Sequence, residues 1–160
     1  MFDEFMGLPL HPLVVHAAVV FVPLLCLFAV VYALVPRVRG AVGWAAATLA
    51  VLAPVVAWVA TQSGKALQAK LISQGFSAEI LAKVAEHKQF GDRTFYVSIP
   101  LGIMTLVLVF LTGTSAARAR AVPAWASIVL AVVVVALAAV TAYYVFRTGD
   151  SGARAVWETG

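Results

Sequence analysis

The chain has 160 residues, of which 63% are hydrophobic and only 11% are charged, and its formal net charge is +4. Soluble domains are about half apolar and a quarter charged, so this composition excludes a soluble globular protein and indicates an integral membrane protein. Positive charge on so apolar a chain favours contact with anionic lipid headgroups rather than nucleic acid. The single cysteine, Cys26, can form no intrachain disulfide.

Four uncharged apolar segments follow one another along the chain. Each is close to the roughly 20 residues that a helix needs to cross a bilayer. Transmembrane strands are shorter and need a closed barrel, so we predict an all-α protein, a four-transmembrane-helix bundle. The first segment is too long for the core of a cleavable signal peptide, and we expect it to remain as an anchor. No internal repeat or second domain is visible, so residues 1–160 form one predicted domain with spans at about 12–35, 41–61, 95–113 and 124–146.

The connection between the second and third spans is polar enough to lie outside the bilayer. It is predicted to form two short amphipathic helices, with Ser77 as the N-cap of the second. His87 continues an apolar stripe with Ile80 and Val84, so it should face whatever this helix packs against. Asp92 is a candidate N-cap for the third span.

Basic loops predict the orientation of the chain. Arg37 and Arg39 lie between the first two spans, Arg118 and Arg120 between the last two, and neither loop contains an acidic residue. The segments on the other side of the membrane contain more basic residues in total, but these segments are longer. We give more weight to the number of basic residues per unit length of loop than to the total. The positive-inside rule then places both short loops in the cytoplasm and both termini outside.

Two of the three histidines open the first span. His11 precedes Pro12, which suits a first helical turn, so His11 is expected to mark the helix start at the interface. His16 lies about 140° further around the helix, so the two rings do not share a face. We expect His16 to point into the bundle, where an ionisable side chain is a candidate functional residue. The alternative is a neutral imidazole that bonds a hydroxyl or carbonyl of another helix.

Two imidazoles from separate helices that close on an apolar, partly outward-open space would suit axial ligation of a b-type haem. His16 and His87 are the predicted ligands, and Arg93, Arg147 and Lys65 are placed to pair with the haem propionates. This hypothesis gives an electron carrier near the outer face that exchanges with quinol or an extracytoplasmic protein. No nucleophile–base pair is evident, so we do not expect a hydrolase or a transferase.

Two other functions stay open. An outward-facing Zn or Cu site could use His11, His16, His87 and Asp150, although their spacing matches no compact metal motif. The chain could also be a non-catalytic accessory subunit of a larger respiratory or transport complex, as a homo- or hetero-oligomer. It contains no CxxCH, phosphate loop or HExxH, which leaves covalent haem, nucleotide hydrolysis and zinc proteolysis without support.

Several motifs resemble those of the prokaryotic membrane family catalogued as domain of unknown function 2231. They are GLPLHPLVVHAAVVFVPL, ATQSGKALQ, VAEHKQFGD and VFRTGDSGARAVW. The resemblance implies a four-helix inner-membrane protein, and the Rieske-type or cytochrome c domains joined to some relatives favour a redox role. Relatives often read GHSGA where this chain has GDSGA, so Asp150 replaces a histidine and is expected to lie near the site or at the surface.

Overall fold

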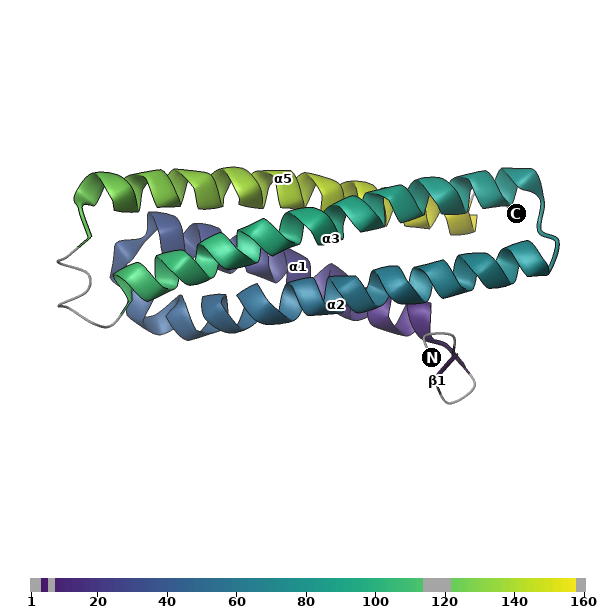
Figure 1. Ribbon diagram of the computed structural model, residues 1–160, viewed down its shortest axis with the longest axis horizontal. Helices are drawn as coiled ribbons and strands as arrows, with labels where there is room; N and C mark the ends of the chain where they lie inside the picture. Colours follow the sequence, from purple (N-terminus) through teal and green to yellow (C-terminus); the bar gives the residue numbers. More distant parts are fainter. Residues whose placement is uncertain (1–3, 6–7, 114–121, 158–160) are drawn as a thin grey trace.

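A computed structural model shows four long helices that run back and forth (Figure 1). It describes the backbone of residues 4–5, 8–113 and 122–157, and side chains from Leu10 onward within these ranges. The predicted all-α bundle is confirmed, with one two-residue antiparallel β-pair before the first helix. The elements are β1 (Glu4–Phe5), β2 (Leu8–Pro9), α1 (Leu10–Leu34), the 3-10 helix η1 (Pro36–Val38), α2 (Arg39–Ser73), α3 (Ala78–Thr112) and α5 (Ala124–Trp157).

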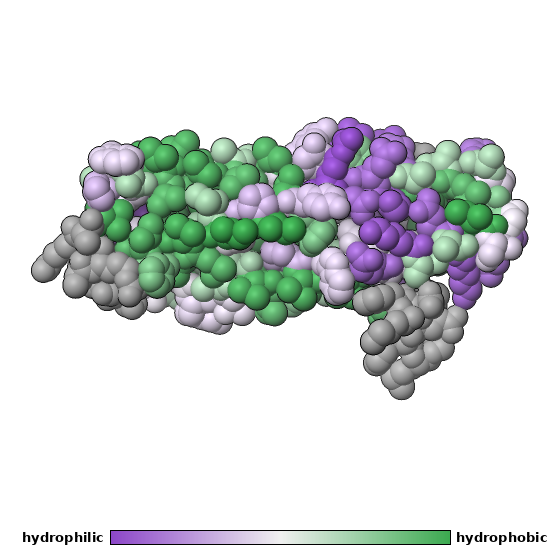
Figure 2. Space-filling view, in the orientation of Figure 1, coloured by the Kyte–Doolittle hydropathy of each residue, from purple (hydrophilic) through white to green (hydrophobic). Residues whose placement is uncertain are grey.

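The helices form a ring in which each packs mainly on its two neighbours, in the order α1, α2, α3, α5 and back to α1. Helices α1 and α3 therefore face each other across the bundle. Both chain termini and the α2–α3 connection lie towards the same end (Figure 1). We call this the histidine end, because His11 and His87 lie there. Hydrophilic side chains gather around this half, whereas the other half is mostly apolar (Figure 2).

The outer surface of the apolar half is covered by apolar side chains, as contact with lipid requires. Each of the four helices is long and apolar enough to cross a membrane. Large apolar side chains such as Trp44, Phe110 and Val132 are exposed rather than packed inside. A soluble protein rarely exposes so much contiguous apolar surface, so the chain is a multi-pass membrane protein.

Small residues allow α2 and α3 to approach closely. Pro54 has no backbone N–H, so the carbonyl of Ala50, one turn earlier, loses its usual helical donor. This oxygen faces Gly102 of α3, where an added Cβ would lie only 2.4 Å away. Ala50 and Gly102 thus form a backbone-to-backbone contact that fixes the α2–α3 crossing.

The predicted pair of separate short helices between the second and third spans was wrong. Helices α2 and α3 simply continue beyond their apolar parts, and only Gln74 to Ser77 interrupt them. Gly75 adopts a φ of 73°, and Ser77 is the N-cap of α3, as predicted, accepting a hydrogen bond from the Ile80 amide at 3.4 Å. Asp92 is not an N-cap, because the helix is already formed there; it pairs with Lys88 at 3.0 Å.

Candidate functional site

The rings of His11 and His87 meet inside the histidine end. His11 comes from the first turn of α1 and His87 from the extended part of α3. Their ring centroids are 6.1 Å apart, and the ring planes make an angle of 73°. Both rings are partly buried, and they lie just outside the predicted spans that begin at residues 12 and 95. Two imidazoles from opposite corners of the bundle therefore face one another.

Helix α2 holds the His11 ring. The Nδ1 atom lies 3.1 Å from the Ala60 carbonyl oxygen and 3.1 Å from the Ser63 Oγ. Ser63 is buried, and its hydroxyl donates to the same Ala60 carbonyl at 3.0 Å. The three groups form a closed triangle of polar atoms between α1 and α2.

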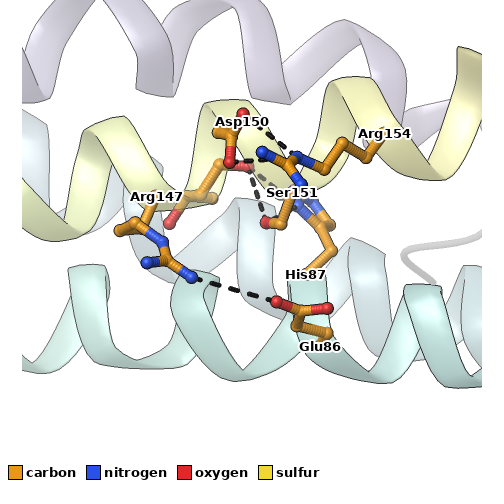
Figure 3. A network of polar contacts seen from close by, with 7 residues as sticks. Glu86, His87, Arg147, Asp150, Ser151 and Arg154 are labelled. Atoms are coloured by element: carbon orange, nitrogen blue, oxygen red, sulfur yellow. Dashed lines mark hydrogen bonds and ion pairs between the residues drawn. The ribbon is translucent and has the colours of Figure 1, made fainter.

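Helix α5 holds the His87 ring in the same way (Figure 3). The Nδ1 atom lies 3.0 Å from the Thr148 carbonyl oxygen and 3.3 Å from the Ser151 Oγ. Ser151 is buried and donates to the Thr148 carbonyl at 3.1 Å. The contacts between α3 and α5 thus repeat those between α1 and α2.

These contacts assign the proton of each imidazole. A carbonyl oxygen can only accept, so the Nδ1 of each histidine must donate. Each serine directs its own proton at the same carbonyl, which leaves its oxygen as a second acceptor for Nδ1–H. A neutral ring with its proton on Nδ1 carries a lone pair on Nε2. A metal-ligating histidine is held in this state, with one nitrogen bonded to the protein and the other available.

A glycine next to each serine makes room for the ring. A Cβ added to Gly64 would lie 3.1 Å from the His11 Cε1, and one added to Gly152 would lie 2.9 Å from the His87 Cε1. Sequence reasoning missed Ser63 and Ser151 as site residues. The sequence pattern that could have identified them is the dipeptide Ser-Gly, which occurs at both positions. It accompanies the same histidine contact in the α1–α2 pair and in the α3–α5 pair.

Burial favours the neutral form of both histidines. Loss of solvent lowers the pKa of His87 from its usual 6.5, partly offset by the hydrogen bond to Thr148. Burial also lowers the pKa of His11, as does the proximity of His87, against a smaller effect of the Ala60 carbonyl. A neutral ring at physiological pH keeps the Nε2 lone pair available.

The predicted inward orientation of His16 was wrong. Its side chain is exposed on the outer surface of α1, and its Nδ1 contacts only the Pro12 carbonyl of its own helix among the hydrogen bonds described. His11, rather than His16, is the histidine of α1 that faces inward. His11 does lie at the helix start, as expected, and it also reaches across to α2.

Two of the three predicted cationic residues, Arg93 and Arg147, lie against the ring of Phe90. The Arg147 guanidinium lies 4.6 Å from the centroid of Phe90, and that of Arg93 lies 5.9 Å from the same ring. Arg93 also contacts Tyr144 at 5.9 Å. Arg147 reaches Glu86 only at 4.0 Å. Lys65 is exposed on α2, directly after Gly64.

Asp150 lies beside the site rather than in it. Its carboxylate pairs with Arg154 one turn later, at 3.2 Å, and its side chain is partly exposed. No group of three or more His, Cys, Asp or Glu side chains that could hold a metal ion occurs among the described residues. The four-ligand metal site considered above therefore does not form in this arrangement.

Fold and site together define a four-helix membrane protein with paired inward-facing histidines at one end. The chain belongs to the family described as "Predicted membrane protein (DUF2231)", whose model matches residues 7–160, which confirms the resemblance noted in the sequence. Comparisons with curated proteins and with solved structures found no match.

Proposed function

We propose that this protein binds a b-type haem between His11 and His87 and transfers electrons at the membrane surface. The observation that carries the proposal is the pair of facing imidazoles, each held through Nδ1. His16 was the ligand expected from the sequence. Its exposed position makes His11 the better partner for His87.

The two rings are near enough to be considered as ligands of one metal. Their centroids are 6.1 Å apart, and each neutral ring would offer the lone pair of its Nε2 atom. A zinc site normally has three or four protein ligands, whereas a bis-histidine haem needs two. The donor set therefore fits haem better than a bare metal ion.

The remaining polar groups suit the same cofactor. Haem supplies one-electron chemistry when bound, and the protein sets its potential through ligands, hydrogen bonds and burial. His11 and His87 would ligate, and the Ala60 and Thr148 carbonyls would orient them. Arg93 and Arg147 are the candidate partners of the propionates.

Orientation and partners form part of the proposal. Arg37 and Arg39 lie at the end opposite the histidines, and the positive-inside rule would assign this basic connection to the cytoplasm. Arg118 and Arg120 are outside the described residues. The histidine end would then face outward from a prokaryotic inner membrane, together with both termini. Quinol or an extracytoplasmic redox protein would exchange electrons there.

The optical spectrum of the purified protein, expressed with haem supplied, tests this function. Bound haem gives a Soret band and an α-band on dithionite reduction. Absence of both bands would refute the proposal and leave the paired histidines as a direct contact within an accessory membrane subunit. Co-purification of a partner complex in mild detergent would then support that second role.

A further inference from the structure

An apolar groove lies between α1 and α5 in the half of the bundle opposite the histidines. It has a volume of about 510 Å³, and it is lined by Ala33 and Leu34 of α1 and by six residues of α5 from Ile128 to Ala139. All of the lining side chains are apolar. Four of them, including Ala33 and Ala136, are alanines, whose small side chains leave the space between the two helices open.

The groove extends through one leaflet of the bilayer rather than through both. Ile128 lies one turn into α5, and Ala139 lies near the middle of the predicted span 124–146. At about 1.5 Å per residue, the groove is about 16 Å long, which is close to half of a hydrocarbon core of about 30 Å. Ile128 and Val132 are exposed, so the groove opens on the surface that faces lipid. A transmembrane helix of another subunit would need contacts through both leaflets, whereas a lipid acyl chain occupies one.

Two arginines lie at the end of the groove that is nearest the membrane surface. Arg39 donates one hydrogen bond to the carbonyl of Ala33 at 3.1 Å and another to that of Tyr32 at 2.9 Å. Both acceptors are neutral, so the positive charge of Arg39 is not cancelled. Arg37 follows Leu34 by three residues and is exposed, with no ion pair among the described residues. The acidic residues that the structure describes all lie towards the histidine end, so this end attracts an anion.

We propose that the groove holds one acyl chain of an anionic phospholipid, whose phosphate lies beside Arg37 and Arg39. A lipid combines the two properties of this surface, because it carries a negative charge at the interface and an apolar chain below it. The chain would fill the space between α1 and α5, the first and last helices of the ring. This binding depends neither on haem nor on which leaflet faces the cytoplasm.

Lipid binding to the delipidated, haem-free protein in detergent tests the headgroup contact. Native mass spectrometry counts the lipid molecules retained as phosphatidylglycerol or phosphatidylcholine is added. The wild type should bind one phosphatidylglycerol more tightly than phosphatidylcholine. Arg37→Gln should weaken the affinity for phosphatidylglycerol about fivefold, the effect of one basic residue near an anionic surface, and leave that for phosphatidylcholine unchanged. Arg154→Gln removes an exposed arginine at the histidine end and is the matched control, which should bind like the wild type.

A larger side chain in the groove tests the acyl-chain contact. Ala136 is exposed at the groove, so Ala136→Leu fills the groove without crowding the core, and it should weaken binding of both lipids. Ala41→Leu is the matched control, because Ala41 is an exposed alanine of α2 at the same end of the bundle that does not line the groove.

A measurement on the wild type alone guards against a variant that does not fold. Phosphatidylglycerol with a photoreactive acyl chain should label residues 128–139 of α5 and the end of α1, and excess unlabelled phosphatidylglycerol should suppress this labelling. Equal affinities of the wild type for the two lipids, equal effects of Arg37→Gln and Arg154→Gln, or labelling spread evenly over all four helices would overturn the proposal. A lipid-free dimer that Ala136→Leu dissociates would also overturn it, because a second copy would then occupy the groove.

Discussion

His11 and His87 make the same two contacts through Nδ1, one with a backbone carbonyl and one with a serine hydroxyl, although they lie on opposite helices of the bundle. Two equivalent units thus face each other across the histidine end. The proposed haem would be a single ligand shared by both rings, and several consequences of this proposal can be measured.

The glycine beside each serine should control the position of the ring. Gly152→Ala introduces a Cβ 2.9 Å from the His87 Cε1, so the imidazole must move away from the Thr148 carbonyl. The helix itself should persist, because alanine favours helix over glycine by about 1 kcal/mol. The ¹⁵N signals of the His87 imidazole should change, and haem affinity should fall.

Gly149→Ala is the matched control for that substitution. Gly149 lies on the same helix, and nothing would contact its added Cβ within 4 Å. It should leave the imidazole signals of His87 unchanged. Equal effects of the two substitutions would show that glycine in α5 does not position the ring.

Loss of one serine should weaken the site without unfolding the bundle. Ser151→Ala removes one acceptor of the His87 Nδ1–H, and the Thr148 carbonyl remains. A hydrogen bond of this kind contributes about 1 kcal/mol, so haem affinity should fall about fivefold. Ser63→Ala should do the same through His11. Haem titrations of both variants test whether the two serines are equivalent. A large loss of haem affinity in only one of the two variants would contradict this.

Haem-free protein should become less stable as the pH falls below about 6.5. Burial lowers the pKa of His87 in the folded state, so between the usual 6.5 and this lower value the unfolded chain binds more protons than the folded one. The contribution of the neutral ring is complete above pH 6.5 and is lost as the pH falls. The free energy of unfolding, measured from pH 8 to 5, should fall with pH in His16→Ala as it does in the wild type. It should fall less steeply in His87→Gln. Parallel profiles for His87→Gln and the wild type would exclude His87 as a source of the slope.

The α2–α3 crossing should tolerate no side chain at Gly102. Gly102→Ala places a Cβ 2.4 Å from the Ala50 carbonyl oxygen, and a backbone atom cannot move aside as a flexible side chain can. Overpacking of this kind costs about 1–3 kcal/mol. The thermal unfolding temperature in detergent should fall. Gly40→Ala, where nothing lies within 4 Å of the added Cβ, should not lower it.

The fold was predictable because the bilayer imposes length and composition on each span. The site was predictable only in part. The apolar stripe of α3 identified His87, but no local pattern showed whether His11 or His16 faces the bundle, because apolar residues surround both on α1. Which of the two histidines faces the bundle depends on contacts with Ser63 and Gly64 of α2. The continuity of α3 through Asp92 likewise depends on packing against α5 rather than on local capping signals.

The reduced-minus-oxidised spectrum of the wild type beside His11→Ala, His87→Ala and His16→Ala, all expressed with haem supplied, tests the central claim most directly. Ligation by both inward-facing rings predicts an α-band and a Soret band in the wild type and in His16→Ala, with both bands lost or shifted in His11→Ala and His87→Ala. Absence of the bands from the wild type, or wild-type bands in either His11→Ala or His87→Ala, would contradict it.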